Sequence, residues 1–423
     1  MLPLFKRREN AIITEGNKLV ETIYEICTFL LFSGYFLFYD NRALQLASVI
    51  IGVGAAALMC LNKAYMSHLK LPLNTIWYFL FFILAEISAF WAHSPKNATG
   101  SYLKLMLILL VIGLGFSQYV NTTRHCENLL RSFMFSSVII SVVQLVFTPV
   151  SQWTSRFFGS EVGGNNPNTF GYVIAMGAII AFFFSYIKGK TLYYAFIPVL
   201  LMCSVFSSSR KSIGAIALGI FLIILFARNK KHRYFHLFIL GIISVIAFVS
   251  LIVNENLYEI IGWRFVSMFE HFSSNQAEAD TSLNLREYFI EFAKILFKEK
   301  PLHGQGFANF SYLLLTESQI SAETYAHNNY WEILADLGII GFIVYYWFYA
   351  ALLIKLIINI ANKKSSTISS LAIAMLISQL ILEVGVVSMA SFFPQIVISL
   401  IYVCSFASDS QRKFHYSPMG GAV

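Results

Sequence analysis

Charged residues are scarce in this sequence, since Asp, Glu, Lys and Arg make up only 12% of its 423 residues. Hydrophobic residues make up 57%, and the mean hydropathy is +0.67. A water-soluble domain cannot bury that much apolar surface, so a soluble globular protein is excluded. Apolar runs of about twenty residues, the length that crosses a bilayer, recur along the chain. We therefore expect an all-α fold with one membrane domain over residues 1–423.

Cysteine is sparse as well, and its spacing indicates no structural site. The chain has five cysteines and no CxxC pair: Cys27, Cys60, Cys126, Cys203 and Cys404. Four of them lie inside apolar segments. Because paired spacing is what distinguishes zinc sites and redox motifs, we expect neither a bound metal nor a disulfide.

The hydrophobic pattern predicts about twelve membrane-spanning helices. Their ranges are 20–38, 44–61, 73–91, 102–120, 129–147, 169–187, 191–206, 212–227, 236–254, 331–358, 368–388 and 390–407. Lys6, Arg7 and Arg8 precede the first run, as they would in a secretory signal. That run ends without a small-residue cleavage pattern, so we expect it to remain as the first span.

The net charge of +8 raises the question of a nucleic-acid partner. The basic residues, however, form short clusters at the ends of apolar runs, the distribution that orients membrane proteins. If the N-terminus is cytoplasmic, the inside connections hold most of these clusters: Lys63, Lys70, Arg124, Arg131, Lys188, Lys190, residues 228–233, Lys363, Lys364, Arg412 and Lys413. We therefore expect both termini in the cytoplasm and no nucleic-acid partner.

This orientation places the long segment 255–330 outside, as a large extracytoplasmic loop. A loop of that length is unusual unless it carries function. Residues 283–300 within it have the period of an amphipathic helix. One face would hold Leu285, Phe289, Phe292, Ile295 and Leu296, and the other Glu287, Glu291, Lys294 and Lys298. Arg286 lies at the boundary, where its guanidinium could reach a lipid headgroup or a substrate phosphate.

Three serines followed by Arg210 and Lys211 lie between two predicted spans on the external side. Hydroxyls together with a guanidinium fork suit a phosphate, so Ser209, Arg210 and Lys211 are candidate binding residues. The alternative is that both basic side chains extend to the interface as lipid anchors. Their external position, which the positive-inside rule disfavours, favours the binding interpretation.

The motif at residues 163–171 leads into the next span and is rich in glycine and asparagine. It predicts a tight turn with Asn168 or Thr169 as the helix N-cap, and this alone would explain the pattern. The alternative is that the loop faces a cavity, where Asn165 and Asn168 would help to bind sugar hydroxyls or a phosphate.

His327 comes directly before a predicted span. Asn329 followed three residues later by Glu332 resembles a capping box, so part of this motif needs only helix chemistry. An imidazole is nevertheless suited to accept a proton from a hydroxyl group at the mouth of a cavity. His327 is therefore a candidate catalytic residue, with Asn328 beside it as a candidate binding residue, and a histidine without function is the alternative.

Taken together, these motifs resemble the O-antigen ligase and polymerase superfamily of bacterial surface-polysaccharide enzymes. The resemblance rests on Ser209 with Arg210 after an apolar span, Arg264 and Arg286 in the large loop, residues 301–306, and residues 327–330 leading to 337–341. It covers residues 160–345 by motif and the rest by the number of spans. Each motif is short, and their order and topological side make the combination specific.

The resemblance implies an inverting glycosyltransferase that needs no metal or cofactor and uses a polyprenyl-diphosphate-linked glycan as donor. Arg210 and Arg286 would hold the diphosphate, with Arg264 as a second candidate, and His327 would act on the acceptor hydroxyl. The enzyme would lie in a bacterial cytoplasmic membrane with its active site facing outside. Its partners would be the glycan donor, the glycan acceptor and membrane lipids, with a chain-length regulator and a flippase as further candidates.

Three functions are compatible with these features. A polymerase would join repeat units, whereas an O-antigen ligase would transfer the glycan to the lipid A core. We favour the polymerase, because residues 165–168 and 208–211 look like forms associated with repeat-unit polymerases. A transporter of lipid-linked solutes is the alternative from another class, and the lack of an internal repeat in the sequence speaks against it.

Overall fold

A computed structural model describes residues 15–38, 41–61, 72–120, 122–153, 167–207, 209–227, 233–263, 265–266, 281–318, 320, 324–362 and 367–407. Every regular element in these ranges is a helix, which confirms the all-α fold class. The N-terminal elements are α1 (Glu15–Leu37), α2 (Arg42–Leu61), α4 (Leu73–Ser88), α5 (Pro95–Ala98), α6 (Ser101–Tyr119), α7 (Thr123–Phe147) and η2 (Val150–Gln152). The middle elements are α8 (Pro167–Tyr186), η3 (Thr191–Ala195), α9 (Phe196–Phe206), α10 (Arg210–Phe226) and α11 (Arg233–Val253).

The remaining elements include the large loop and the C-terminal helices. Residues 255–330 contain α12 (Glu255–Leu257), η4 (Tyr258–Gly262), α14 (Thr281–Glu299) and α15 (Phe310–Glu317). They are followed by α16 (Asn329–Ala361), α17 (Ile368–Leu382) and α18 (Phe392–Phe406). Each predicted span falls on one of the described helices, with η3 and α9 sharing one span.

Several of these helices have the length and composition of membrane spans. Six described helices are long and apolar enough to cross a membrane, namely α1, α2, α7, α8, α11 and α16. Shorter apolar helices lie at Leu73–Ser88, Lys104–Tyr119, Thr191–Phe206, Ile368–Leu382 and Phe392–Phe406. The protein is therefore an integral membrane protein, and the number of twelve spans stays a prediction.

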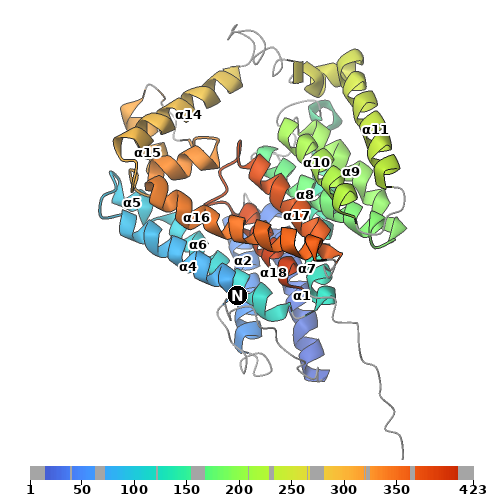
Figure 1. Cartoon of the computed structure of the whole chain (residues 1–423), viewed down its shortest axis with the longest axis horizontal. Coiled ribbons are helices and arrows are strands. Elements are labelled where there is room, and N and C mark those ends of the chain that lie inside the picture. The colour runs from blue at the N-terminus through green and yellow to red at the C-terminus, as the bar shows by residue number, and fades with distance from the viewer. Residues whose placement is uncertain are drawn as a thin grey trace, which may run out of the picture.

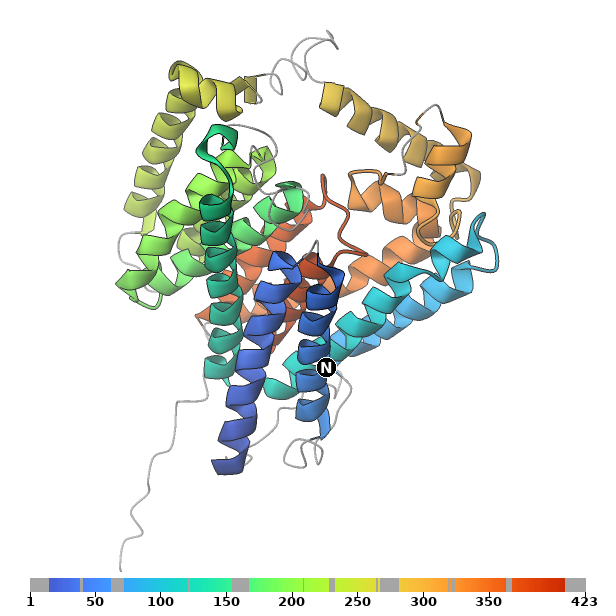
Figure 2. The ribbon, with the colours of Figure 1, turned by 180° about the vertical axis from the view of Figure 1, so that it is seen from behind.

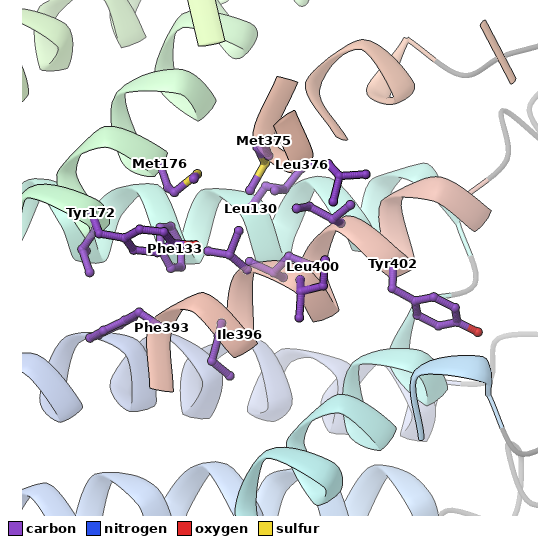
Figure 3. Packing of buried hydrophobic residues seen from close by; sticks show 14 of the residues in the cluster. Leu130, Phe133, Tyr172, Met176, Met375, Leu376, Phe393, Ile396, Leu400 and Tyr402 are labelled. Carbon is purple, nitrogen blue, oxygen red and sulfur yellow. The ribbon is translucent and has the colours of Figure 1, made fainter. Parts of the chain in front are cut away.

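The core of the bundle lies where α7, α8, α17 and α18 meet (Figure 3). Its side chains include Leu130 and Phe133 of α7, Tyr172 and Met176 of α8, Met375 and Leu376 of α17, and Phe393, Ile396, Leu400 and Tyr402 of α18. In the most apolar stretch of α8, 83% of the residues are buried inside the protein, whereas in the corresponding stretch of α11 none are buried. Helix α8 is therefore largely enclosed by the bundle, whereas α11 is peripheral.

The prediction of no disulfide is wrong for one pair of cysteines. Cys126 of α7 and Cys404 of α18 are joined by a disulfide, with Cα atoms 6.0 Å apart. They are 278 residues apart in the chain, so their spacing carries no signal of the pairing. The first turn of α7 and the last turn of α18 lie side by side, and only this packing brings the two thiols together.

Helices α14 and α15 of the large loop lie at one end of the molecule. Figures 1 and 2 show α14 and α15 at the upper end, above α16, while the N-terminal end of α1 lies at the opposite, lower end. The amphipathic helix predicted for residues 283–300 is present as α14. Phe289, Ala293 and Leu296 are buried against α15 and α16, but Leu285 and Ile295 are 42% and 53% exposed. Part of the predicted apolar face therefore packs on protein, and the rest is exposed.

Helix α16 is broken near its start by the sharp turn at residues 301–309. Gly338 has φ 63° and ψ −162°, which interrupts the helical hydrogen bonds. The turn replaces them, since Ile339 N and Ile340 N donate to the carbonyls of Pro301 and Leu302 at 2.9 and 3.1 Å. Because backbone polar groups in a membrane protein need internal partners, this exchange permits a kink within a span.

The backbone conformation of Gly338 predicts that a residue with a Cβ is poorly tolerated at this position. Its φ and ψ lie in a region that is essentially restricted to glycine, where another residue costs about 1–3 kcal/mol. A Cβ would also meet the backbone of Leu302. We expect Gly338→Ala to lower the thermal unfolding midpoint of the purified protein, whereas Gly241→Ala, in open space on α11, should leave it unchanged or raise it. An unaltered midpoint in Gly338→Ala would contradict the tight packing of this turn.

Candidate functional site

The first turn of α10 carries the serine and basic residues of the Ser209 motif. Ser209 is the N-cap residue, and it is buried against Gly171 of α8, where an added Cβ would lie 3.1 Å from the Ser209 Cβ. Glycine at position 171 therefore lets the start of α10 approach α8 closely. The Lys211 ammonium donates a hydrogen bond to the carbonyl of Gly385. Lys211 is thus tied to the segment between α17 and α18.

Residues of α10 and α14 together form a positively charged cluster. The charges of Arg286, on α14, and of Arg210 both act on the Lys211 ammonium. Arg210 and Lys211 are neighbours on α10, whereas Arg286 comes from α14, far away in the sequence. Since like charges repel and an anion would relieve the repulsion, this cluster is suited to bind a phosphate group.

His327 is held in an unusual backbone conformation at the entrance to α16. Its φ is 54°, in the left-handed region that few residues other than glycine adopt. Its ring lies 4.1 Å from that of Tyr325 and 5.9 Å from that of Phe289, centroid to centroid, and it is nearly parallel to the Phe289 ring. Strained conformations persist only where the surroundings fix them, and they concentrate at functional sites.

The surroundings of His327 fix the backbone on both sides. Before it, Ala326 N donates to the Glu332 carboxylate at 2.7 Å. After it, the Asn328 side chain accepts from Tyr330 N and Trp331 N at 3.0 and 3.2 Å. The N-cap is therefore Asn328, and the predicted capping box between Asn329 and Glu332 is wrong. Glu332 reaches back beyond the cap because the left-handed residue turns the preceding chain towards it.

Helix α14 links the basic cluster to the histidine. Arg286 and Phe289 are three residues apart, so they lie on neighbouring positions of one helix face. The charge of Arg286 acts on Lys211, and the Phe289 ring contacts the imidazole of His327. Arg286 is thus linked to Arg210 and Lys211 by charge, and its neighbour Phe289 is linked to His327 by a ring contact.

Two of the remaining candidates are not described by the structure, and two others do not have the predicted capping role. Asn165 and Arg264 lie outside the described residues. Asn168 and Thr169 are not the N-cap of α8, since the helix already begins at Pro167. Proline suits the first helical position because its φ is fixed near the helical value and its missing N–H would have had no helical partner there.

A buried carboxylate near the site went unnoticed in the sequence. Glu383 follows α17, and it lies inside the apolar run predicted as the span 368–388. An ionisable residue within such a run is itself a signal of function, and this signal could have identified it.

The fold and this cluster define an integral membrane protein with a basic, histidine-bearing region at one end of a helical bundle. Residues 195–346 match the model of the O-antigen ligase family. This match confirms the resemblance to the O-antigen ligase and polymerase superfamily over that segment. The segment contains Arg210, Lys211, Arg286 and His327, and it ends before Glu383. No curated protein matches the chain significantly.

Proposed function

We propose that this protein is a glycosyltransferase that joins polyprenyl-diphosphate-linked oligosaccharide repeat units at the extracytoplasmic face of a bacterial cytoplasmic membrane. The observation that carries the proposal is the grouping of Arg210, Lys211 and Arg286 with His327, within the segment that matches the O-antigen ligase family. In this proposal both chain termini are cytoplasmic, and residues 255–330 form the extracytoplasmic loop over the site.

The basic cluster suits the leaving group of such a reaction. A sugar bonded to a diphosphate already has a good leaving group, so catalysis requires stabilisation of the charge that develops on the departing oxygens. Arginine supplies a fixed positive charge and a planar fork of donors that matches phosphate oxygens. Arg210 and Arg286 would bind the diphosphate in this way, with Lys211 adding a third charge, and Arg264 is a further candidate.

The histidine suits the acceptor. The attacking hydroxyl must be held in line on the opposite face of the sugar ring, and its proton needs a destination. The neutral imidazole of His327 would accept that proton, so that one bond forms from the acceptor oxygen to the anomeric carbon while the bond to the diphosphate breaks. Attack from the opposite face inverts the anomeric configuration. Ser209 and Asn328 adjoin Arg210 and His327 in the sequence, and Asn168 lies in the first turn of α8, close to Gly171, which packs against Ser209. These three residues would assist in binding.

Purified protein in lipid nanodiscs, supplied with lipid-diphosphate oligosaccharide, tests the proposal. A polymerase would yield longer lipid-linked glycans, which is the result we expect. Transfer of glycan only to a lipid A core acceptor would instead assign the ligase activity that shares the donor site. In sealed vesicles, movement of the lipid-linked substrate without any product would overturn the enzyme proposal in favour of a transporter.

A further inference from the structure

The Glu383 carboxylate is the centre of a buried polar network. The residue is only 1% exposed, and five side-chain donors surround its two oxygens. Oε1 accepts from Ser388 Oγ at 2.6 Å, the Tyr349 hydroxyl at 3.0 Å and Gln379 Nε2 at 3.3 Å, while Oε2 accepts from the Tyr346 hydroxyl at 2.8 Å and Asn329 Nδ2 at 3.4 Å. These donors come from α16, α17 and the segment 383–391, which we call the connector.

Asn329 joins this network to the start of α16. Its backbone N–H donates to the carbonyl of Glu383 at 2.9 Å. Its side-chain oxygen accepts from the backbone N–H groups of Ser388 and Met389 at 2.9 and 3.1 Å. Its side-chain amide donates to the Tyr346 hydroxyl at 2.8 Å as well as to Glu383. Asn329 is two residues from His327, so the connector fixes the end of α16 that carries the histidine.

The same connector contacts the basic cluster on its other side. The Lys211 ammonium donates to the carbonyl of Gly385, two residues after Glu383. A Cβ at Gly385 would collide with the Lys211 side chain, so glycine is what allows the lysine to reach this carbonyl. The connector is therefore hydrogen-bonded to Asn329, which lies beside His327, and to Lys211, which lies beside Arg210.

We infer that Glu383 is a positioning residue that holds the His327 end of α16 in register with the Arg210 and Lys211 end of α10. This inference rests on the proposed function, because it assigns to the connector the spacing between the proton acceptor and the diphosphate site. Glu383 acts through Asn329 and the connector backbone, and it touches no substrate.

The chemistry of the network requires a carboxylate at this position. All five side-chain partners donate, and a carboxylate is the side chain that only accepts. A glutamine of the same size would present an amide N–H₂ to groups that are themselves donors, so at least one donor would lose its acceptor in a buried place. Glu383→Gln therefore disturbs the register with almost no change in volume.

The experiment compares Glu383→Gln and Tyr346→Phe with the wild type by initial rates over a range of donor concentrations. A reacting group displaced by about 1 Å can cost on the order of 10²-fold in rate. We expect kcat to fall by about that factor in Glu383→Gln, and by less in Tyr346→Phe, with the donor KM unchanged because the basic cluster remains. The amount of folded protein is measured for each variant, so that a lower kcat cannot be attributed to loss of folded protein. Tyr402→Phe is the matched control, as this hydroxyl bonds Leu73 N, away from Glu383.

A double variant tests the route through Asn329. If Glu383 acts through that residue, Asn329→Ala with Glu383→Gln should be no slower than the slower single variant, because residues in one network are not additive. Full kcat in folded Glu383→Gln, or losses that multiply in the double variant, would overturn the inference. If the wild-type protein forms no glycan product, both the proposed function and this inference are overturned. If the wild type is active and Glu383→Gln is equally active, only the inference is overturned.

Discussion

Replacement of His327 by alanine is expected to abolish glycan transfer while expression and membrane insertion stay normal. The acceptor hydroxyl would lose the group that takes its proton, and general base catalysis contributes about 10²–10⁴-fold. Rates would be measured with purified protein and lipid-diphosphate oligosaccharide. The donor KM should change little, because the basic residues on α10 and α14 remain in place.

The left-handed conformation of His327 calls for a second variant. Alanine is disfavoured at φ 54°, so His327→Ala combines loss of the imidazole with backbone strain. Asparagine tolerates this conformation but cannot accept the proton, so His327→Asn should be equally inactive and better folded. His303→Ala removes an exposed histidine from the neighbouring turn and should leave the rate unchanged. Full activity of His327→Asn would remove this residue from the mechanism.

Arg210→Lys is the second substitution with a large expected effect. The change keeps the positive charge but replaces the planar fork of donors with a single ammonium. If Arg210 binds the diphosphate through two parallel hydrogen bonds, turnover should fall by about 10²–10³-fold, the loss typical for one donor to a developing negative charge. Initial rates and donor KM would be compared with those of the wild type at equal amounts of folded protein.

Arg131→Lys provides the matched control for this prediction. Arg131 lies on α7 and pairs with Glu127 at 3.1 Å, and neither residue belongs to the basic cluster. The same chemical change there should leave glycan transfer near the wild-type rate. Near-normal turnover in Arg210→Lys as well would mean that Arg210 serves as an interfacial anchor.

Local sequence patterns predicted most of the fold. Each predicted span coincides with a described helix, because hydrophobic length is a property of consecutive residues. The amphipathic pattern of residues 283–300 likewise predicted α14. The errors occur where a partner from elsewhere in the chain decides the outcome. Cys126 pairs with Cys404, and the Asn329 side chain accepts hydrogen bonds from Ser388 N and Met389 N instead of capping α16.

The candidate site could be predicted in part for the same reason. Arg210, Lys211, Arg286 and His327 stand out because basic and titratable residues are rare beside apolar runs. Glu383 was overlooked, although a carboxylate inside an apolar run is a recognised signal. Its role depends on partners from α16 and the connector, and nothing in the local sequence around Glu383 indicates them.

The sequence by itself determined that this is a helical membrane protein, where its helices lie and which residues are candidates for the site. Hydrophobic periodicity and the scarcity of charge are sufficient for these conclusions because each acts over neighbouring residues. Only the tertiary structure decided which of those residues meet. Lys211 reaches Gly385, 174 residues away, and Cys126 reaches Cys404, 278 residues away, because helix packing sets these contacts.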